Sequence, residues 1–287
     1  MTPFHLLAFA VSFAMVGICS ALAMAGGSNP LTVVTVRTAE TVVILLAWLR
    51  VAGVSLAMTR RDLVRVALIA VPLTLNNYLI NAAFALIPVP LAVLIFYLWP
   101  ALSTVASWLL GRDRFRMRSA AGLAAAFAGV ALALNVEFSA AQMRGVALAA
   151  AAAVAWSVAF ILMGELFRGR DTRPPTFYAT AIALAVFLIS CMVTGEVRMP
   201  QDRAGWVGLA AVGFFYSFAL IGLFAATARI GPMRAGFYMN FEPVAAVLLA
   251  ALILGQRLQP VQLAGAALVI GALFLFRSAR ASPSTEN

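Results

Sequence analysis

Residues 237–255 read FYMNFEPVAAVLLAALILG and have the length and apolar character of a membrane-spanning helix. Asn240, Glu242 and Pro243 interrupt this stretch. A carboxylate at the centre of a membrane helix costs about 2.5–3.5 kcal/mol to insert, and such residues usually face a cavity or a partner. Proline lacks a backbone donor, so the sequence predicts a helix that is kinked at this point.

A second stretch, residues 92–111, reads AVLIFYLWPALSTVASWLLG and carries Trp99-Pro100 in the place of Glu242-Pro243. The offset is 143 residues, the separation of Pro100 from Pro243. Without gaps, 97–133 and 240–276 agree at seven positions, against about three expected by chance in such Ala- and Leu-rich text. The pairs are Pro100/Pro243, Leu109/Leu252, Arg114/Arg257, Ala121/Ala264, Gly122/Gly265, Ala124/Ala267 and Leu132/Leu275.

The composition is that of a polytopic membrane protein. Of 287 residues, 64% are hydrophobic and 10% are charged, whereas a soluble domain has roughly 25% charged residues. The two cysteines, Cys19 and Cys191, lie inside apolar runs, so no disulfide framework or metal spacing exists. His5 is the one histidine. We therefore expect no metal, no cofactor and no enzymatic activity.

The apolar runs predict ten transmembrane helices with no soluble domain between them. The first run lacks a basic leader and is long enough to span the bilayer, so we interpret it as a retained helix rather than a signal peptide. The predicted spans are 4–25, 31–52, 63–86, 89–110, 117–135, 144–167, 175–194, 204–227, 232–254 and 260–276.

Arginines in the loops predict the orientation. The net charge of +10 does not indicate a nucleic-acid-binding face, because the arginines fall in short loops between apolar runs. The opposite loops hold only Arg144, Arg198, Arg203 and Arg257. By the positive-inside rule, we expect both termini on the cytoplasmic side of a bacterial inner membrane. The arginines on that side are 50, 60, 61, 65, 112, 114, 116, 118, 168, 170, 173, 229, 277 and 280.

The offset of 143 residues also superposes the predicted spans, so it predicts a duplicated five-helix unit. Because five is odd, the second copy enters the membrane from the opposite face. The predicted fold is therefore an all-α integral membrane protein with two inverted repeats, 1–142 and 143–277, and a disordered cytoplasmic tail, 278–287. Inverted repeats are typical of secondary transporters with a site near the midplane.

The segment NFEPVAAVLLAALILGQRLQPVQLAGAALVIGALFLF (240–276) resembles the second-repeat signature of the drug/metabolite transporter superfamily, in its ten-helix EamA-type branch. Gln256 departs from the pattern, which usually has a Glu after the glycine. Tyr97-Leu98-Trp99-Pro100 is similar to bacterial aromatic amino-acid exporters of this superfamily. The resemblance implies a substrate cavity lined by the third, fourth, eighth and ninth helices.

Ionisable residues inside the predicted helices are the first site candidates. Arg234, Tyr238 and Glu242 follow at i, i+4 and i+8, so they share one helix face. Each charge has alternative interpretations. Arg234 either snorkels to the surface or lines a cavity, and Glu242 either braces the kink or else contacts substrate or carries a proton. Arg37 and Glu40 can pair at i, i+3, as a structural pair or as a gate.

Amides and aromatic rings complete the predicted site. Asn76, Asn77, Tyr78 and Asn81 form a polar cluster in the third helix that either lines the cavity or packs against another helix. Aromatic rings suit flat apolar ligands, although they also pack or face lipid. The predicted substrate-binding residues are Asn77, Tyr78, Asn81, Tyr97, Trp99, Phe215, Tyr216, Tyr238, Asn240 and Glu242, with Trp156 as a further contributor.

Tight turns after the third and eighth helices are predicted joints for rocking the helical hairpins, with plain turn formation as the alternative. They contain Pro88 and Pro90, and Gly231 and Pro232. Small residues in the fifth and tenth helices predict close packing, either within one chain or across a dimer. These are Gly122, Ala126, Gly129, Ala264, Gly265 and Gly271.

We interpret the chain as a secondary transporter that exports aromatic or hydrophobic amino acids by alternating access. The alternative is an exporter of drugs or other metabolites, such as nucleosides or sugars, with the same fold. An enzyme would need a nucleophile or a metal-binding cluster, which the sequence lacks. The sequence also has no nucleotide-binding motif, so we do not expect ATP hydrolysis to drive transport directly. The expected partners are a small-molecule substrate and the lipid bilayer, but no nucleic acid. We expect a monomer or a weak homodimer.

Overall fold

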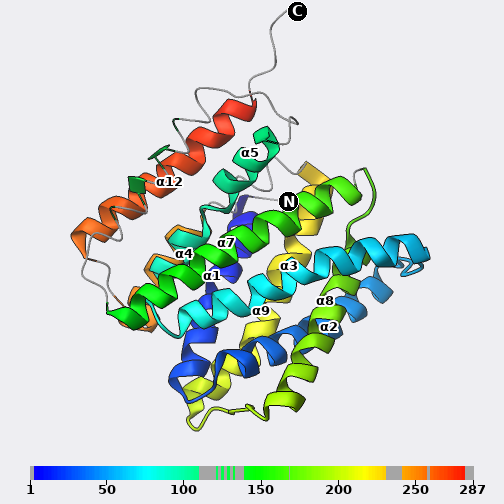
Figure 1. Ribbon diagram of the computed structural model, residues 1–287, viewed down its shortest axis with the longest axis horizontal. Coiled ribbons are helices and arrows are strands. Elements are labelled where there is room, and N and C mark those ends of the chain that lie inside the picture. The colour runs from blue at the N-terminus through cyan, green and yellow to red at the C-terminus, as the bar shows by residue number, and fades with distance from the viewer. Residues whose placement is uncertain are drawn as a thin grey trace, which may run out of the picture.

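All regular secondary structure that the computed structural model describes is α-helical (Figure 1). The described residues are 3–109, 121, 124–125, 128–129, 132, 139–167, 169–230, 241–256 and 259–281. The helices are α1 Pro3–Ala25, α2 Pro30–Val51, α3 Arg60–Phe84, α4 Val89–Phe96, α5 Trp99–Leu109, α7 Ala140–Leu166, α8 Arg173–Thr194, α9 Arg203–Ile230, α11 Glu242–Ile253 and α12 Pro260–Ala281.

Six of the described helices, α1, α2, α3, α7, α8 and α9, are long and apolar enough to cross a membrane. Each begins and ends within a few residues of a predicted span. Local sequence explains several of these starts. Asn29 and Thr59 accept hydrogen bonds from the first turns of α2 and α3, and Ser139 forms a capping box with Gln142 at the start of α7.

Two predicted spans differ from the structure. The span 89–110 is two helices, α4 and α5, separated at Tyr97 and Leu98. The described part of the span 232–254 is α11, which begins at Glu242. The span 89–110 is therefore not one continuous helix, and α11 starts at Glu242, while the part of the span 232–254 that precedes 241 lies outside the described residues. Each proline instead occupies the second residue of a new helix, where its missing N–H leaves no helical hydrogen bond unmade.

At the chain's end, α12 continues to Ala281, into the tail that we predicted to begin at 278. Most of the predicted fifth span, 117–135, lies outside the described residues. In that region Ala125 packs against a core that includes Ala266 of α12, and a Cβ on Gly129 would lie 2.8 Å from the carbonyl oxygen of Gly265 in α12. This close approach of Gly129 to α12 is within one chain and requires glycine.

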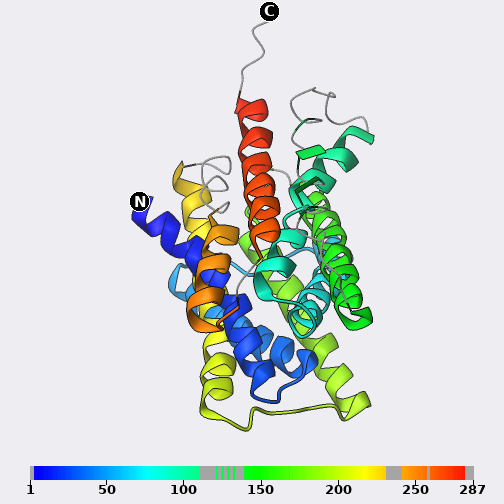
Figure 2. The same cartoon turned by 90° about the vertical axis from the view of Figure 1, so that its left-hand side faces the viewer.

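Helix α1 lies at the centre of the bundle. In its most apolar stretch 67% of the residues are buried, against 28% in α8. Val16 and Cys19 pack against Val212 of α9, while Ala14 and Ile18 belong to a core with α4 and α11. Figure 2 shows α1 running beside α11 and α9. The N-terminal helix is therefore enclosed by helices from the second half of the chain.

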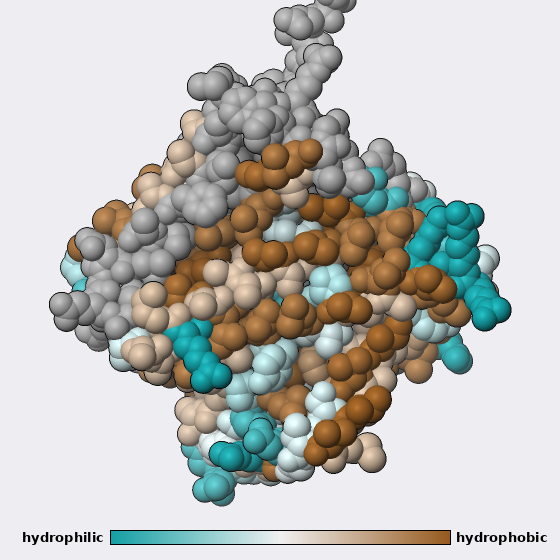
Figure 3. Space-filling model, viewed as in Figure 1, coloured by the Kyte–Doolittle hydropathy of each residue, from teal (hydrophilic) through white to brown (hydrophobic). Residues whose placement is uncertain are grey.

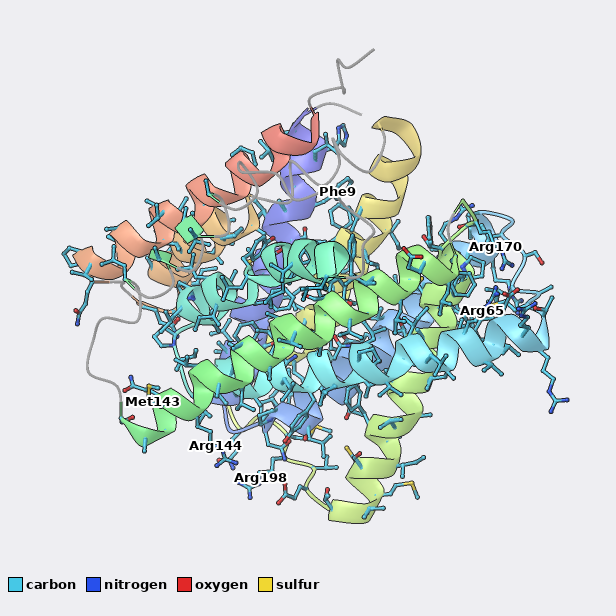
Figure 4. All side chains as sticks on the ribbon, turned by 45° about the horizontal axis from the view of Figure 1, so that its top comes forward. Phe9, Arg65, Met143, Arg144, Arg170 and Arg198 are labelled. Atoms are coloured by element: carbon cyan, nitrogen blue, oxygen red, sulfur yellow. The ribbon has the colours of Figure 1, made fainter. Side chains whose placement is uncertain are left out.

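Phe9 shows how closely α1 and α9 approach (Figure 4). A Cβ built on Gly222 of α9 would overlap the Phe9 ring, and a Cβ on Gly208 would lie 2.6 Å from the carbonyl oxygen of Cys19. Glycine at these two positions lets the two backbones pack together, as small residues do between membrane helices. Helices α7, α3 and α8 cross the front of the molecule in Figure 1, and this face is mostly hydrophobic in Figure 3, as expected for contact with lipid.

Candidate functional site

Tyr97 and Glu242 meet where α4 ends and α11 begins. Tyr97 caps the end of α4, and Glu242 is the first residue of α11. The Tyr97 hydroxyl donates to Oε2 of Glu242 at 2.7 Å, and Tyr97 is buried with 4% of its surface exposed. The N-terminus of a helix also favours a negative charge. Two predicted substrate-binding residues, 145 positions apart, are thus brought together.

Trp99 lies beside this pair in an aromatic cluster with α7. Its ring centroid is 6.4 Å from that of Trp156 and 5.1 Å from that of Phe160. Phe96 contacts both Tyr97 and Trp156, at 6.3 Å in each case. A continuous row of rings therefore extends from the Tyr97–Glu242 contact along α7, and it offers flat apolar surface to a ligand.

Arg37 of α2 is buried, with 3% of its surface exposed. Its Nη2 donates to Oδ1 of Asn77 in α3 at 2.9 Å, and its guanidinium lies 4.8 Å from the centroid of the Tyr216 ring in α9. Among the described residues, no carboxylate lies within ion-pairing distance of Arg37. A buried cation held only by an amide and a ring has capacity to bind an anion.

The predicted pairing of Arg37 with Glu40 was wrong. Oε2 of Glu40 accepts a hydrogen bond from the backbone N–H of Gly213 in α9 at 2.8 Å. A Cβ at Gly213 would overlap the Glu40 side chain, so glycine is what allows the carboxylate to reach the backbone of α9. Glu40 thus contacts α9, whereas Arg37 contacts both α3 and α9.

The three asparagines of α3, Asn76, Asn77 and Asn81, are all buried. Asn77 and Asn81 are buried on one face, and Nδ2 of Asn81 donates to the carbonyl of Asn77 at 2.8 Å. The buried Oδ1 atoms of Asn76 and Asn81 have no hydrogen-bond partner among the described residues. Buried acceptors are nearly always hydrogen-bonded, so these oxygens are positions for water or a ligand donor.

Tyr78 does not join these amides. It is 40% exposed and lies on the outer side of α3, facing α8. The predicted aromatic residues of α9 also divide: Phe215 packs against Val16 and Cys19 of α1, and Tyr216 contacts Phe13 of α1 edge-on at 6.1 Å. Phe214 and Phe218 stack on one another and are exposed on the outer face, at 57% and 43%.

The Arg37–Asn77–Tyr216 contacts and the Tyr97–Glu242 contact lie on two sides of one stretch of α1. Phe13 touches Tyr216, while Ala14 and Ile18 share a core with Tyr97. Met15 packs against the core that contains Tyr97 and also against the α1–α9 cluster that Tyr216 borders. The two polar contacts are therefore separated by the thickness of a single helix.

Several predicted positions lie outside the described residues. These are Arg234, Tyr238 and Asn240, and the turn residues Gly231 and Pro232. In the other predicted turn, Pro88 is the N-cap of α4 and Pro90 is in its first turn. The side-chain oxygen Oε1 of Gln256 accepts from the N–H of Val89 at 3.0 Å, so the residue that departs from the family pattern caps α4.

Sequence reasoning missed three contributors. Gly213 provides the donor for Glu40, Phe160 extends the aromatic cluster, and Ser157 donates to the carbonyl of Trp99 at 3.0 Å, beside the helix break. The sequence held one signal for these contributors: Gly213 directly precedes the aromatic run Phe214-Phe215-Tyr216, and a glycine there permits a close approach of another helix. Phe160 and Ser157 follow Trp156 at i+4 and i+1, but nothing in their local pattern separates them from residues that only pack.

An ion-pair cluster fixes one end of the bundle. Arg170, in the α7–α8 loop, donates to both carboxylate oxygens of Asp62 in α3, each at 2.8 Å, and Arg65 adds a contact at 3.2 Å. Figure 4 shows Arg65 and Arg170 at this end. The Asp62 carboxylate raises the pKa of Arg170, and the neighbouring Asp171 has its own pKa lowered by its hydrogen bonds from Arg173. Within the described residues, no cluster of His, Cys, Asp or Glu suits a metal.

Comparison with known proteins agrees with this architecture. No curated protein matches the chain. A solved structure titled "Crystal structure of protein" superposes with a TM-score of 0.65 at 20% identity, covering 94% of this chain and 96% of that chain, which shows a shared fold. The sequence profile of the EamA-like transporter family matches twice, over residues 3–135 and 143–278. With nearly its whole length matched, and with polar contacts gathered between apolar helices, this chain belongs to the EamA-like transporter family.

Proposed function

We propose that this membrane transporter of the drug/metabolite transporter superfamily exports amino acids, preferentially aromatic or hydrophobic ones, across the bacterial inner membrane. The observation that carries the proposal is the buried Arg37 guanidinium, which has no carboxylate partner among the described residues. A substrate carboxylate is the anion that would complete this site, because a guanidinium binds a carboxylate through two parallel hydrogen bonds.

An amino acid also needs a partner for its ammonium group and a surface for its side chain. Glu242 supplies a negative charge that Tyr97 holds in place, and the buried Oδ1 of Asn81 supplies a neutral acceptor. The rings of Trp99 and Trp156 offer apolar surface next to Glu242. The ammonium and carboxylate of an amino acid share one carbon, whereas Arg37 and Glu242 lie on two sides of α1. The substrate therefore meets the two charges at different steps of transport, and Asn81 is the acceptor for the ammonium while Arg37 binds the carboxylate.

We further propose that transport proceeds by alternating access of two inverted five-helix halves in a ten-helix protein with cytoplasmic termini. The packing supports the duplication. An offset of 143 residues relates α1 to α7 and α3 to α9; α1 packs along α9, and correspondingly α7 packs along α3. Likewise α2 packs against α9, and α8 against α3. The related pairs Trp99-Pro100 and Glu242-Pro243 each begin a helix, and the family profile matches once in each half.

The test is flux through proteoliposomes with radiolabelled Phe, Trp, Met and Thr and with a cationic dye. Two analogues of phenylalanine isolate its charges: phenethylamine lacks the carboxylate, and 3-phenylpropionate lacks the ammonium. We expect transport of phenylalanine in preference to both. In Arg37→Gln the preference over phenethylamine should be lost, and in Glu242→Gln the preference over 3-phenylpropionate. Absence of flux for every amino acid would contradict the proposal.

A second candidate keeps the fold but changes the cargo to a lipophilic cation or another metabolite. The observation that favours it is Glu242 itself, because a carboxylate next to aromatic rings suffices to bind an organic cation. In this case the dye is transported, Glu242→Gln abolishes its flux, and Arg37→Gln leaves that flux unchanged. The two variants thus separate the two cargoes in one set of measurements.

A further inference from the structure

A groove of about 500 Å³ lies on the outer face of the bundle between α3 and α8. Its walls include Val71 and Leu75 of α3, which are 69% and 50% exposed, and Val186 of α8, which is 43% exposed. These helices face the viewer in Figure 1, where the surface is mostly hydrophobic (Figure 3). In a membrane this groove opens toward lipid acyl chains, because apolar side chains on the outside of a helical bundle face the hydrocarbon region.

The lining changes from apolar to polar along the groove. Near the middle of the two helices it consists of side chains such as Val71 and Ile182. Toward the end of α8 it includes Ser190, Thr194 and finally Glu196, just beyond the last helical residue. The apolar part of the groove therefore matches the acyl chain of a membrane lipid, and its charged end matches the headgroup.

Glu196 is held at the mouth of the groove by contacts of its backbone. Gly195 ends α8 with a φ of +65°, a conformation that favours glycine, and turns the chain. Nδ2 of Asn29 then donates to the carbonyl of Glu196 at 2.8 Å, and the N–H of Arg198 donates to Oγ1 of Thr32 at 3.0 Å. The carboxylate of Glu196 has no hydrogen-bond or ion-pair partner among the described residues.

A second groove, on the other side of α3, provides a comparison within the same molecule. It lies between α3 and α7, has a volume of about 660 Å³, and is lined by apolar side chains such as Leu68, Leu79 and Val158. It has the shape for a chain but no charge for a headgroup. The α3–α8 groove differs from it by the polar end that contains Glu196.

We propose that the α3–α8 groove binds an acyl chain of a phospholipid whose headgroup carries a primary ammonium, and that Glu196 contacts this ammonium. Phosphatidylethanolamine has this chemistry, whereas phosphatidylglycerol has similar chains and a phosphate but no ammonium. Discrimination between the two lipids therefore depends on Glu196, which attracts the ammonium and repels an anionic headgroup.

The experiment measures lipids that remain bound to the purified full-length transporter, by native mass spectrometry after equilibration with equimolar phosphatidylethanolamine and phosphatidylglycerol. The wild-type chain should retain phosphatidylethanolamine severalfold in preference. Glu196→Gln should remove most of this preference, and Glu196→Asp should keep it. Ser190→Phe, which fills the groove, should reduce retention of both lipids. Its matched control is Ile189→Phe, because Ile189 is the adjacent residue of α8, is 59% exposed and does not line the groove.

Three results would overturn the proposal. One is equal retention of both lipids by the wild-type chain. Another is an unchanged preference in Glu196→Gln while thermal unfolding shows that the variant is folded. The third is equal loss of lipid in Ser190→Phe and Ile189→Phe, which would mean that the groove is not the position of the lipid. Because the readout is lipid retention and not flux, none of these results depends on which cargo is transported.

Discussion

The hydroxyl of Tyr97 donates to Oε2 of Glu242 at 2.7 Å and so joins the end of α4 to the beginning of α11. A tyrosine hydroxyl that donates to a partly buried carboxylate fixes the position of the carboxylate and leaves its other oxygen available to a ligand. Each half of the chain contributes one member of this contact, at the places where two predicted spans are broken.

Tyr97→Phe should therefore reduce transport without unfolding the protein. A hydrogen bond to a charged group contributes about 1.5–3 kcal/mol, so we expect kcat/KM to fall about tenfold or more. The matched control is Tyr178→Phe, which also removes one buried hydroxyl contact, to the carbonyl of Leu56 at 3.0 Å, but outside the site. Flux that decreases equally in both variants would show that the Tyr97 hydroxyl has no special role.

If transport is coupled to protons, Glu242 is the expected carrier. Glu242→Gln keeps the shape of the side chain but cannot exchange a proton, so substrate accumulation driven by a pH gradient should be lost. Exchange of substrate across the same vesicles without a gradient provides the control. Unchanged accumulation in Glu242→Gln would exclude this residue as the proton carrier.

Gly213→Ala should destabilise the contact between α2 and α9. The added methyl group overlaps the Glu40 side chain, and overpacking of this kind costs about 1–3 kcal/mol. Gly164→Ala in α7 is the control, because nothing lies within 4 Å of the added methyl group there. We expect a lower Tm for the first variant, and for the second an unchanged or slightly higher Tm, as alanine favours helix over glycine. Equal Tm values would contradict the contact.

The Asp62–Arg170 pair should hold the α7–α8 loop against α3. Asp62→Asn should lower the Tm more than Arg65→Gln, because Arg170 donates to both oxygens of Asp62 whereas Arg65 donates to one. The exchanged double variant Asp62→Arg/Arg170→Asp should recover part of the loss, by an amount that decreases as salt increases. A double variant no more stable than the single variants would indicate that the pair contributes little.

Gln256→Ala should weaken the start of α4, since it removes the acceptor for the N–H of Val89. The expected cost is about 0.5–1.5 kcal/mol, seen as a lower Tm. Gln256→Glu restores the residue usual in the family and retains an oxygen at the same position, so it should remain close to wild type. A loss of stability in Gln256→Glu as large as in Gln256→Ala would show that the side-chain oxygen is not the relevant group.

The sequence alone was sufficient for the class of fold and for most of the long helices, because their apolar runs have a length that only membrane-spanning helices require. It could not decide what Pro243 does. A missing N–H is compatible with a kink in one helix and with the first turn of another, and the surrounding backbone selects between them.

The sequence also could not predict which residues the buried charged side chains contact. Arg37 and Glu40 have the spacing of an ion pair, but Asn77 and Gly213, far away in the sequence, take their places as partners. Tyr78 illustrates a related difficulty, because lipid and a polar cavity both accept a tyrosine, and helical periodicity cannot separate the two.

The central place of α1 has a consequence for biosynthesis. This helix ends at Ala25, whereas its partners α9 and α11 comprise residues 203–253, so α1 leaves the ribosome well before they are made. Until then the faces that will pack against them must be covered by lipid or by a membrane chaperone, and Gly222, which admits the Phe9 ring, is not yet synthesised. Packing around α1 is thus completed only after α9 and α11 are made, and a helix made earlier is enclosed by helices made later.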